Sequence, residues 1–201
     1  MTTHKLETPI SEEVVRNLRV GDTVYITGTI LTARDQAHQR AVNFHNQGKS
    51  LPLDLEGMVI FHCGPLVRKK NRGWEVIAAG PTTSSRIEPF QAEFIEAFKT
   101  RIIVGKGGMG ARTAEAMKKF GAIYCEFTGG AAVLAAKLVK KVKGVKWLDL
   151  GVPEALWMLE VEKFGPLVVT IDSYGNNLYE QVAKKVEQKK PIIYRKLGIV
   201  P

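Results

Sequence analysis

The chain has 201 residues, of which 45% are hydrophobic and 24% charged, so it can bury a core of ordinary size and has a globular composition. It contains no apolar run long enough for a membrane span, and its first residues lack the apolar segment of a secretory signal. Its two cysteines, Cys63 and Cys125, are too few for a disulfide framework or for the four ligands of an iron–sulfur cluster, and we expect a cytoplasmic protein.

The net charge is +9, which on its own would be compatible with nucleic-acid binding. The lysines, however, are spread over several helix-like segments, as is typical of solvated helix faces. A positive field also attracts small anions, which would suit a carboxylate substrate.

The first hundred residues are expected to be mainly β. We predict strands at 23–31, 58–62 and 74–79, the last of them after a hairpin turn at 69–73. We predict helices that begin after Ser11, that run from Thr32 to about Asn46, and that span 89–99.

From residue 101 onward, strands and helices alternate. The predicted strands lie at 102–104, 122–127, 145–150, up to 164, and 167–171, and the predicted helices at 111–120, 130–139 and 177–188, with a loose tail after Lys189. The whole chain, 1–201, is therefore predicted to form one α/β domain with a mixed sheet flanked by helices.

The segment Gly105–Gly110, GKGGMG, fits the pattern G-x-G-x-x-G and follows an apolar strand, with the acidic residue Glu126 about 20 residues further on. Glycines allow close backbone approach, and the helix that follows offers free N–H groups to an anion. The loop could hold a dinucleotide, hold another anion together with Lys106, or be a tight turn without a ligand.

Two other segments carry groups that can bind a carboxylate. The loop 79–86, AGPTTSSR, contains a run of hydroxyls followed by Arg86, although the same residues could form an ordinary polar turn. In the segment 32–38, TARDQAH, Arg34 and His38 are four residues apart and Asp35 could orient the arginine, unless this is simply a charged helix start. The four histidines show no metal-ligand spacing.

Six segments taken in order resemble one family: VGDTVYITGTILTARDQAH, HCGPLVRK, AGPTTSSRIE, VGKGGMG, PEALW and FGPLVVTIDSYGNNLY. They are similar to the β subunit of the iron–sulfur-dependent class I hydro-lyases, the fumarate hydratase and L(+)-tartrate dehydratase family, over roughly residues 8–185. The resemblance implies a swivelling β/β/α domain. It also implies that GKGGMG is the family's lysine-bearing substrate loop and not a nucleotide site.

The resemblance further implies how the chain would work. A separate α subunit would carry a [4Fe–4S] cluster whose open iron acts as a Lewis acid, and two copies of each subunit would assemble as α2β2. Arg34, Arg86 and Lys106 would bind the carboxylates of fumarate or L-malate, and Thr82 would be the base for the Cα–H proton. Asp35 and His38 would orient Arg34.

Three alternatives to fumarate hydration stay open at this point. The chain could be the β subunit of an L(+)-tartrate dehydratase, which the same motifs fit. It could be a NAD-binding oxidoreductase domain that uses GKGGMG and Glu126. It could also be a basic module that binds nucleic acid, although no basic strand face rich in aromatic residues supports this.

Overall fold

The structure is a computed structural model and describes residues 1–71 and 73–199. Within these residues a seven-stranded mixed sheet has the strand order β1-β2-β3-β6-β7-β9-β8. These strands are β1 (Thr3–Glu7), β2 (Thr23–Thr32), β3 (Val59–Phe61), β6 (Ile102–Gly105), β7 (Ile123–Glu126), β8 (Val139–Lys146) and β9 (Leu156–Ile171). Neighbours from β1 to β7 are parallel, whereas β9 runs antiparallel to β7, β8 and β2.

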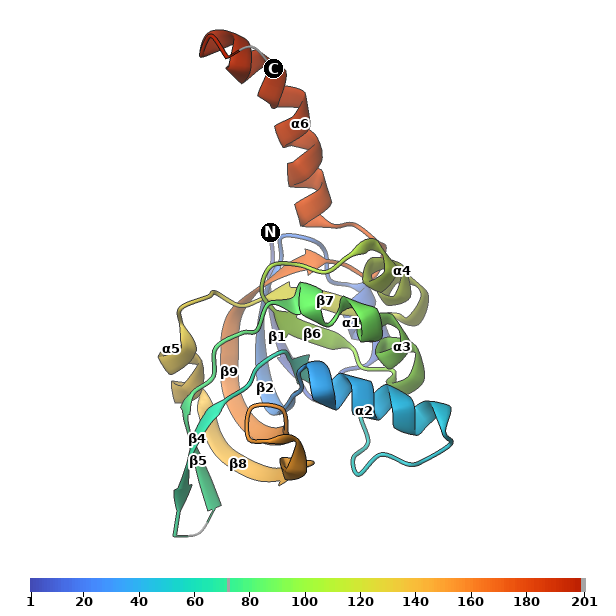
Figure 1. Cartoon of the computed structure of the whole chain (residues 1–201), viewed down its shortest axis with the longest axis vertical. Helices are drawn as coiled ribbons and strands as arrows, with labels where there is room; N and C mark the ends of the chain where they lie inside the picture. Colours follow the sequence, from blue (N-terminus) through green and yellow to red (C-terminus); the bar gives the residue numbers. More distant parts are fainter. Residues whose placement is uncertain (72, 200–201) are drawn as a thin grey trace.

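The long strand β9 closes the sheet on itself. One part of it pairs with β2, as in Leu31 with Met158, and its end pairs with β7, as in Tyr124 with Ile171. The pairings β2-β3-β6-β7-β9-β2 therefore form a ring, which leaves β1 and β8 as the outer strands. A separate hairpin, β4 (Leu66–Lys70) and β5 (Gly73–Ala78), extends away from this ring (Figure 1).

Three helices, α2 (Asp35–Asn46), α3 (Glu88–Phe98) and α4 (Ala111–Phe120), pack side by side on one face of the parallel strands (Figure 1). The remaining helical segments are α1 (Glu12–Arg16), α5 (Ala132–Lys137), α6 (Leu178–Lys196) and the short 3-10 helices η1 (Ser84–Arg86) and η2 (Leu148–Leu150). Helix α6 projects away from the rest of the protein. None of the helices in the described residues is both long and apolar enough to cross a membrane.

Two hydrophobic cores explain why the short central strands β3 and β6 are apolar throughout. Ile102 and Val104 face the core inside the ring of strands, whereas Ile103 between them faces the core under the helices. Successive side chains of a strand point to opposite faces, and here both faces are covered, so every position must be apolar.

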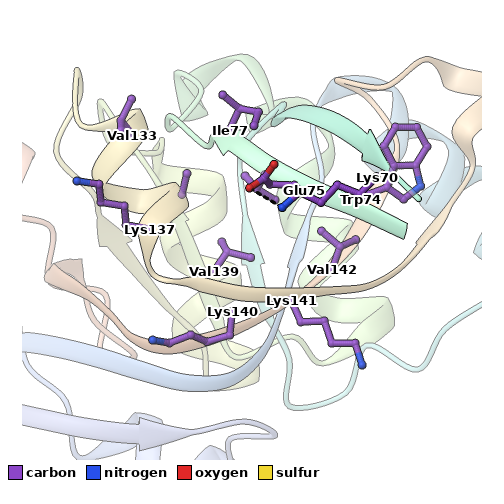
Figure 2. A pocket seen from close by; sticks show the side chains of 12 residues that line it. Lys70, Trp74, Glu75, Ile77, Val133, Lys137, Val139, Lys140, Lys141 and Val142 are labelled. Atoms are coloured by element: carbon purple, nitrogen blue, oxygen red, sulfur yellow. Dashed lines mark ion pairs between the residues drawn. The ribbon is translucent and has the colours of Figure 1, made fainter. Parts of the chain in front are cut away.

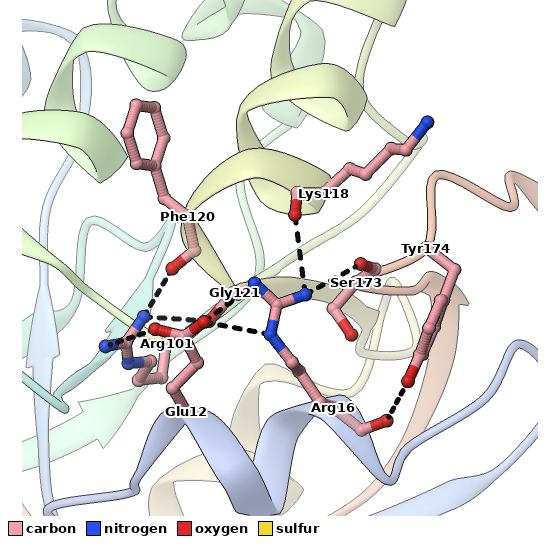
Figure 3. A network of polar contacts seen from close by, with 8 residues as sticks. All are labelled: Glu12, Arg16, Arg101, Lys118, Phe120, Gly121, Ser173 and Tyr174. Carbon is pink, nitrogen blue, oxygen red and sulfur yellow. Dashed lines mark hydrogen bonds and ion pairs between the residues drawn. The ribbon is translucent and has the colours of Figure 1, made fainter.

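A network around Arg101 ties the end of α4 to α1 (Figure 3). The Arg101 guanidinium donates to the carbonyl oxygens of Phe120 and Gly121, the last residues of α4 and its cap, and pairs with Glu12 at 3.3 Å. Arg16 Nε donates to the same carboxylate at 2.8 Å. These contacts satisfy helix-end carbonyls that would otherwise be buried without partners, and they lie at the edge of the sheet where β6 begins.

The predicted mixed α/β fold with helices flanking a mixed sheet is confirmed. Several element predictions were wrong. The strand expected at 145–150 is the end of β8 followed by η2, and the helix expected at 130–139 is the shorter α5, because the lysine-rich sequence 139–146 forms an outer strand. Strand β1 was not predicted, and α6 continues to Lys196, with Pro191 inside it, where a loose tail was expected.

Candidate active site

The residues singled out in the sequence gather at the carboxyl ends of the parallel strands. Arg34 follows β2, Lys106 follows β6, and Glu126 ends β7. The loop that carries Thr82 and Arg86 follows β5 and returns to this edge through a bridge between residues 83 and 106. The carboxyl edge of an open parallel sheet is a common place for ligand binding, because loops of several strands meet there.

Arg34 precedes helix α2 instead of belonging to it. Its backbone is extended, and α2 begins at Asp35 and not at Thr32 as we predicted, so Arg34 lies before the helix that carries His38. The two residues are nevertheless in contact, since His38 Nδ1 lies 2.9 Å from the Arg34 carbonyl oxygen. His38 therefore supports the backbone of Arg34 from the buried side.

The Arg34 guanidinium is held by Glu154, a residue 120 positions away. Arg34 Nε lies 3.3 Å from Glu154 Oε1, and the other carboxylate oxygen accepts from the Gln36 backbone N–H at 3.0 Å. Among the described residues Nε has no aligned hydrogen bond, so this contact is an ion pair. The Arg34 guanidinium also lies close to the backbone of Gly64. A side chain at position 64 would block it, because a Cβ there would lie 2.5 Å from Arg34 Nη1.

Asp35 pairs with Arg86 and not with Arg34. The distance from Asp35 Oδ2 to Arg86 Nη2 is 3.2 Å, and the Arg86 side chain is 55% exposed. The helix start at Asp35 directs this carboxylate toward η1, which carries Arg86. Because Asp35 directly follows Arg34 in the chain, its ion pair with Arg86 brings the second arginine near the first.

Backbone hydrogen bonds fix the loop that contains Thr82. The Thr82 N–H donates to the His62 carbonyl oxygen at 2.6 Å, and the Ser84 N–H donates to the Lys106 carbonyl oxygen at 3.0 Å. The half-buried Thr82 therefore lies against the end of β3, and η1 lies against the end of β6.

Below this loop, Ser84 is the centre of a buried hydrogen-bond chain. Tyr124 OH donates to Ser84 Oγ at 2.9 Å, and Ser84 Oγ lies 2.9 Å from His62 Nδ1. His62 Nε2 lies 2.8 Å from Gln91 Oε1, which can only accept. Burial holds the pKa of His62 well below 6.5, so the ring is neutral, donates from Nε2 and accepts the Ser84 proton at Nδ1.

Gly105, the first glycine of GKGGMG, is required by this chain of hydrogen bonds. A Cβ at residue 105 would lie 1.9 Å from Ser84 Oγ and 3.0 Å from Tyr124 OH, which no side-chain atom can do without a shift of the surroundings. The glycine therefore makes room for Ser84 and does not itself indicate a ligand.

The anion position at the start of α4 is filled by the protein. The Glu88 carboxylate accepts from the Gly110 N–H at 2.7 Å, from the Thr113 N–H at 3.1 Å and from the Thr113 hydroxyl at 2.8 Å. Glu126, the acid of the NAD-binding alternative, accepts from the Gly107 N–H at 3.2 Å and from Tyr179 OH. A pyrophosphate would have to displace Glu88, so the geometry argues against a dinucleotide.

Lys106 remains available to a ligand. Its stem passes Gly129, where a Cβ would lie 3.7 Å from Lys106 Cδ, and it forms no ion pair within the described residues. Arg34 and Arg86 each face one carboxylate, Glu154 and Asp35. This edge of the sheet therefore carries three cations and offers charge to an incoming carboxylate.

The part of the chain that the structure describes offers no side chains that fit an iron–sulfur cluster. Cys63 and Cys125 are buried, and burial raises the pKa of the Cys63 thiol to about 12 and raises that of Cys125 as well. Across residues 1–71 and 73–199, no three His, Cys, Asp or Glu side chains are grouped to hold a metal ion. Thiolates are the required ligands, and these thiols stay protonated.

A cavity of about 440 Å³ lies away from these residues, between the β4–β5 hairpin, α5 and β8. The acidic residue that lines this cavity is Glu75, whose carboxylate pairs with Lys70 at 3.0 Å (Figure 2). The ammonium groups of Lys137 and Lys141 point outward from it, and Ile77 lines it with several valines. It is not suited to a dicarboxylate.

Three residues of the site were not assigned a role from the sequence: Ser84, Glu88 and Glu154. Ser84 belongs to a hydroxyl run whose members look alike in the sequence, and Glu88 begins a helix, where an acid is ordinary. Glu154 was within a quoted motif, PEALW, but nothing in the sequence indicated that it would reach Arg34.

Known proteins give an independent view of the chain. It is 47% identical over 189 residues to the L(+)-tartrate dehydratase subunit beta of Escherichia coli strain K12, covering 94% of this chain and 92% of that protein. It is 44% identical over 181 residues to a putative L(+)-tartrate dehydratase subunit beta of Methanocaldococcus jannaschii, covering 90% and 93%. It is 45% identical over 185 residues to a putative fumarate hydratase class I of Geobacillus stearothermophilus, covering 92% of this chain and 35% of that protein.

Residues 2–182 match the family described as Fumarase C-terminus. The match covers most of the chain and includes every site residue named above. The chain therefore belongs to the Fumarase C-terminus family, together with the β subunits of L(+)-tartrate dehydratases and with class I fumarate hydratases.

Proposed function

We propose that this chain is the β subunit of a two-subunit hydro-lyase that interconverts fumarate and L-malate. The observation that carries the proposal is that Arg34, Lys106 and the loop of Thr82 and Arg86 meet at the carboxyl ends of the parallel strands, through the Asp35–Arg86 ion pair and the bridge between residues 83 and 106, in a chain of this family. A four-carbon dicarboxylate needs two anion-binding positions, and three cations at one edge of the sheet can supply them.

The arginines and the lysine have different tasks in this proposal. Arg34, held by Glu154 through Nε, keeps its terminal nitrogens for one carboxylate. Arg86 is exposed and held on one side by Asp35, and Lys106 has no ion pair within the described residues, so both can approach the other carboxylate. His38 acts through the backbone of Arg34.

Thr82 is the proposed base for the Cα–H proton. In the dehydration direction the C–H bond breaks and the proton passes to the deprotonated Thr82 oxygen. The hydroxyl on the neighbouring carbon takes up a second proton, from solvent or the partner subunit, and leaves as water as the double bond forms. A threonine hydroxyl is a weak base, and positive charge nearby stabilises its deprotonated form and the developing carbanion. Arg86 and Lys106 are the candidates for that charge.

The partner of this chain is a separate α subunit that carries the [4Fe–4S] cluster, with two copies of each subunit in the complex. The names of the Escherichia coli and Methanocaldococcus jannaschii relatives, each a subunit beta, support a partner subunit. The buried thiols of this chain support placing the cluster on the partner. The isolated chain is then inactive.

L(+)-tartrate dehydration is the second candidate. It is favoured by one observation, namely that the relatives of similar length carry the name L(+)-tartrate dehydratase subunit beta. L-malate and L(+)-tartrate differ by one hydroxyl, and the same three cations would bind either dicarboxylate.

The test is anaerobic purification of the chain with its partner from the native host, followed by assays of fumarate hydration and L-tartrate dehydration. Thr82→Val, which removes the hydroxyl at similar size, should lower kcat by about 10²-fold or more with little change in KM. Lys106→Met should mainly raise KM. The control is Ser85→Ala, an exposed neighbour that forms no hydrogen bond in the described structure.

Each outcome has a distinct meaning. Turnover of tartrate alone would keep the residue roles and replace the substrate. A Thr82→Val enzyme with normal kcat would remove Thr82 as the base. A complex with an intact cluster that turns over neither substrate would refute the proposal, and NAD binding would be the next assay.

A further inference from the structure

Helix α6 has an apolar stripe that no other part of residues 1–71 and 73–199 covers. At 100° per residue, Tyr179, Val182, Val186, Ile193 and Leu197 fall within about 60° around the helix axis. The last four are 48–66% exposed, and no residue of α6 is buried. Figure 1 shows the helix projecting from the body of the protein.

A helix of this kind needs a partner to remain ordered. It has 19 residues and contains Pro191, and the structure, over the residues that it describes, buries none of them. Isolated helices of such length are marginal in water, and most helix stability in proteins comes from burying an apolar face. Three stripe residues, Val182, Val186 and Ile193, line a shallow hollow of about 360 Å³ on α6 together with Tyr194 and three lysines.

The charges of α6 indicate what the partner must present. The helix has two acids, Glu180 and Glu187, and six cations, which gives a net charge of +4: Lys184, Lys185, Lys189, Lys190, Arg195 and Lys196. A second copy of this chain would bring the same positive charge against it. An apolar groove bordered by Asp and Glu side chains is complementary in both respects.

The base of α6 is attached to the substrate-binding loop. The Tyr179 ring lies against Gly108, where a Cβ would be 2.8 Å from the ring, and Tyr179 OH donates to Glu126. The other oxygen of Glu126 accepts from the Gly107 N–H at 3.2 Å, directly after Lys106. A force on α6 is therefore transmitted to the loop that carries Lys106.

We infer that α6 is the helix through which this chain binds the cluster-bearing α subunit. Its apolar stripe docks in an apolar groove of that subunit that has acidic borders. Docking also fixes the position of the Lys106 loop through Tyr179. The inference rests on the proposed function, which supplies the α subunit as the partner. Because α6 starts beside Lys106, it projects from the edge that such a partner must approach. Most of α6 lies beyond residue 182, where the family match ends.

The test uses the full chain produced with the α subunit of its native host, without oxygen. Val186→Asp/Ile193→Asp places two acids in the stripe, and Gln181→Asp/Gln188→Asp places two acids on the opposite side of the same helix. The first pair should weaken the complex by at least 100-fold in Kd, and the control pair by less than threefold. Because α6 is not buried, both should fold like the wild type, which thermal unfolding checks.

The link to the loop is tested by Tyr179→Phe, which removes only the hydroxyl bound to Glu126. The complex should form with unchanged Kd, while KM for the dicarboxylate should rise three- to tenfold. An unchanged KM would overturn the coupling to Lys106. An unchanged Kd together with a raised KM in this conservative variant separates docking from the position of the loop.

Assembly and activity are measured separately, so the two proposals can fail separately. If Val186→Asp/Ile193→Asp binds the α subunit like the wild type, the docking inference is wrong even when fumarate is turned over. If the wild-type chain alone is a dimer that this variant dissociates, the stripe binds a second copy and the inference is wrong. If the complex forms through the stripe but hydrates neither substrate, the docking inference stands and the proposed function fails.

Discussion

Replacing Ser84 with alanine is expected to destabilise the fold strongly, because its hydroxyl satisfies two buried groups at once. Tyr124 OH donates to Ser84 Oγ, and Ser84 donates to His62 Nδ1, each at 2.9 Å. The alanine leaves a buried donor and a buried acceptor without partners, and each costs about 1–3 kcal/mol. The expected loss in the free energy of unfolding is therefore about 2–6 kcal/mol.

The assay is equilibrium unfolding in urea of the Ser84→Ala and Ser85→Ala variants. The neighbouring Ser85 is exposed, so its replacement should stay within about 0.5 kcal/mol of the wild type. In a thermal scan the Ser84 variant should lose at least about 4 °C, since 1 kcal/mol corresponds to about 2–4 °C at this chain length. Adding Tyr124→Phe to Ser84→Ala removes the unpaired hydroxyl and should restore about 1–2 kcal/mol.

Two results would refute this reasoning. Equal stability of the Ser84→Ala and Ser85→Ala variants would mean that the buried chain contributes nothing net. A double variant less stable than Ser84→Ala alone would mean that Tyr124 OH is paired elsewhere.

Three further predictions concern other parts of the site. Glu154→Gln should raise KM for the dicarboxylate by about 5–30-fold, because Arg34 loses its ion pair. This corresponds to a loss of about 1–2 kcal/mol in the free energy of binding. Cys63 and Cys125 should not react with a thiol reagent at pH 8 in the native protein and should react fully in urea, since burial raises the pKa of both thiols. Burial lowers the pKa of His38 to about 4, so between pH 6.5 and 4 the unfolded chain takes up a proton that the folded chain does not. The free energy of unfolding should then fall as the pH falls through this range, and His38 alone should account for about 3 kcal/mol of the loss. The His38→Gln variant should lose less stability over the same pH range.

Each of these has a result that contradicts it. A KM within twofold of the wild type in Glu154→Gln would show that Arg34 is held without its carboxylate. Rapid labelling of either thiol in the native protein would contradict their burial. Identical slopes of stability against pH for the wild type and His38→Gln would assign the acid sensitivity to other groups, of which the buried His62 is the first candidate.

The sequence predicted the buried parallel strands β3, β6 and β7 well, because strands covered on both faces are largely apolar, as in Ile102–Gly105. It missed the parallel strand β1, whose residues alternate between half-buried and exposed. It failed at β8, where lysines alternate with valines on an outer strand and resemble a solvated segment. The ring of strands could not be predicted, since it depends on β9 bending to pair with both β2 and β7. Such pairings are decided by tertiary packing and not by local pattern.

The placement of Arg34, Lys106 and the Thr82–Arg86 loop after strands could be predicted, because these cations and hydroxyls follow apolar or β-branched runs, whereas their ligand-binding roles stay a prediction. Their supports could not. Ser84 and Ser85 are identical neighbours in the sequence, yet one is buried under the loop and the other faces solvent. Glu154 reaches Arg34 across 120 positions, and Asp35 reaches Arg86 across 51, so only the folded chain brings these charges together.

The missing side chain at Gly105 has a consequence for how related sequences can vary. The space that a Cβ would occupy is taken by Ser84 Oγ, at 1.9 Å, and is bordered by Tyr124 OH. Alanine at position 105 is then compatible only with a smaller residue at 84, and the loss of that hydroxyl removes the reason for a tyrosine at 124. Positions 84, 105 and 124 should therefore change together or not at all among members of the family, whatever dicarboxylate each of them uses.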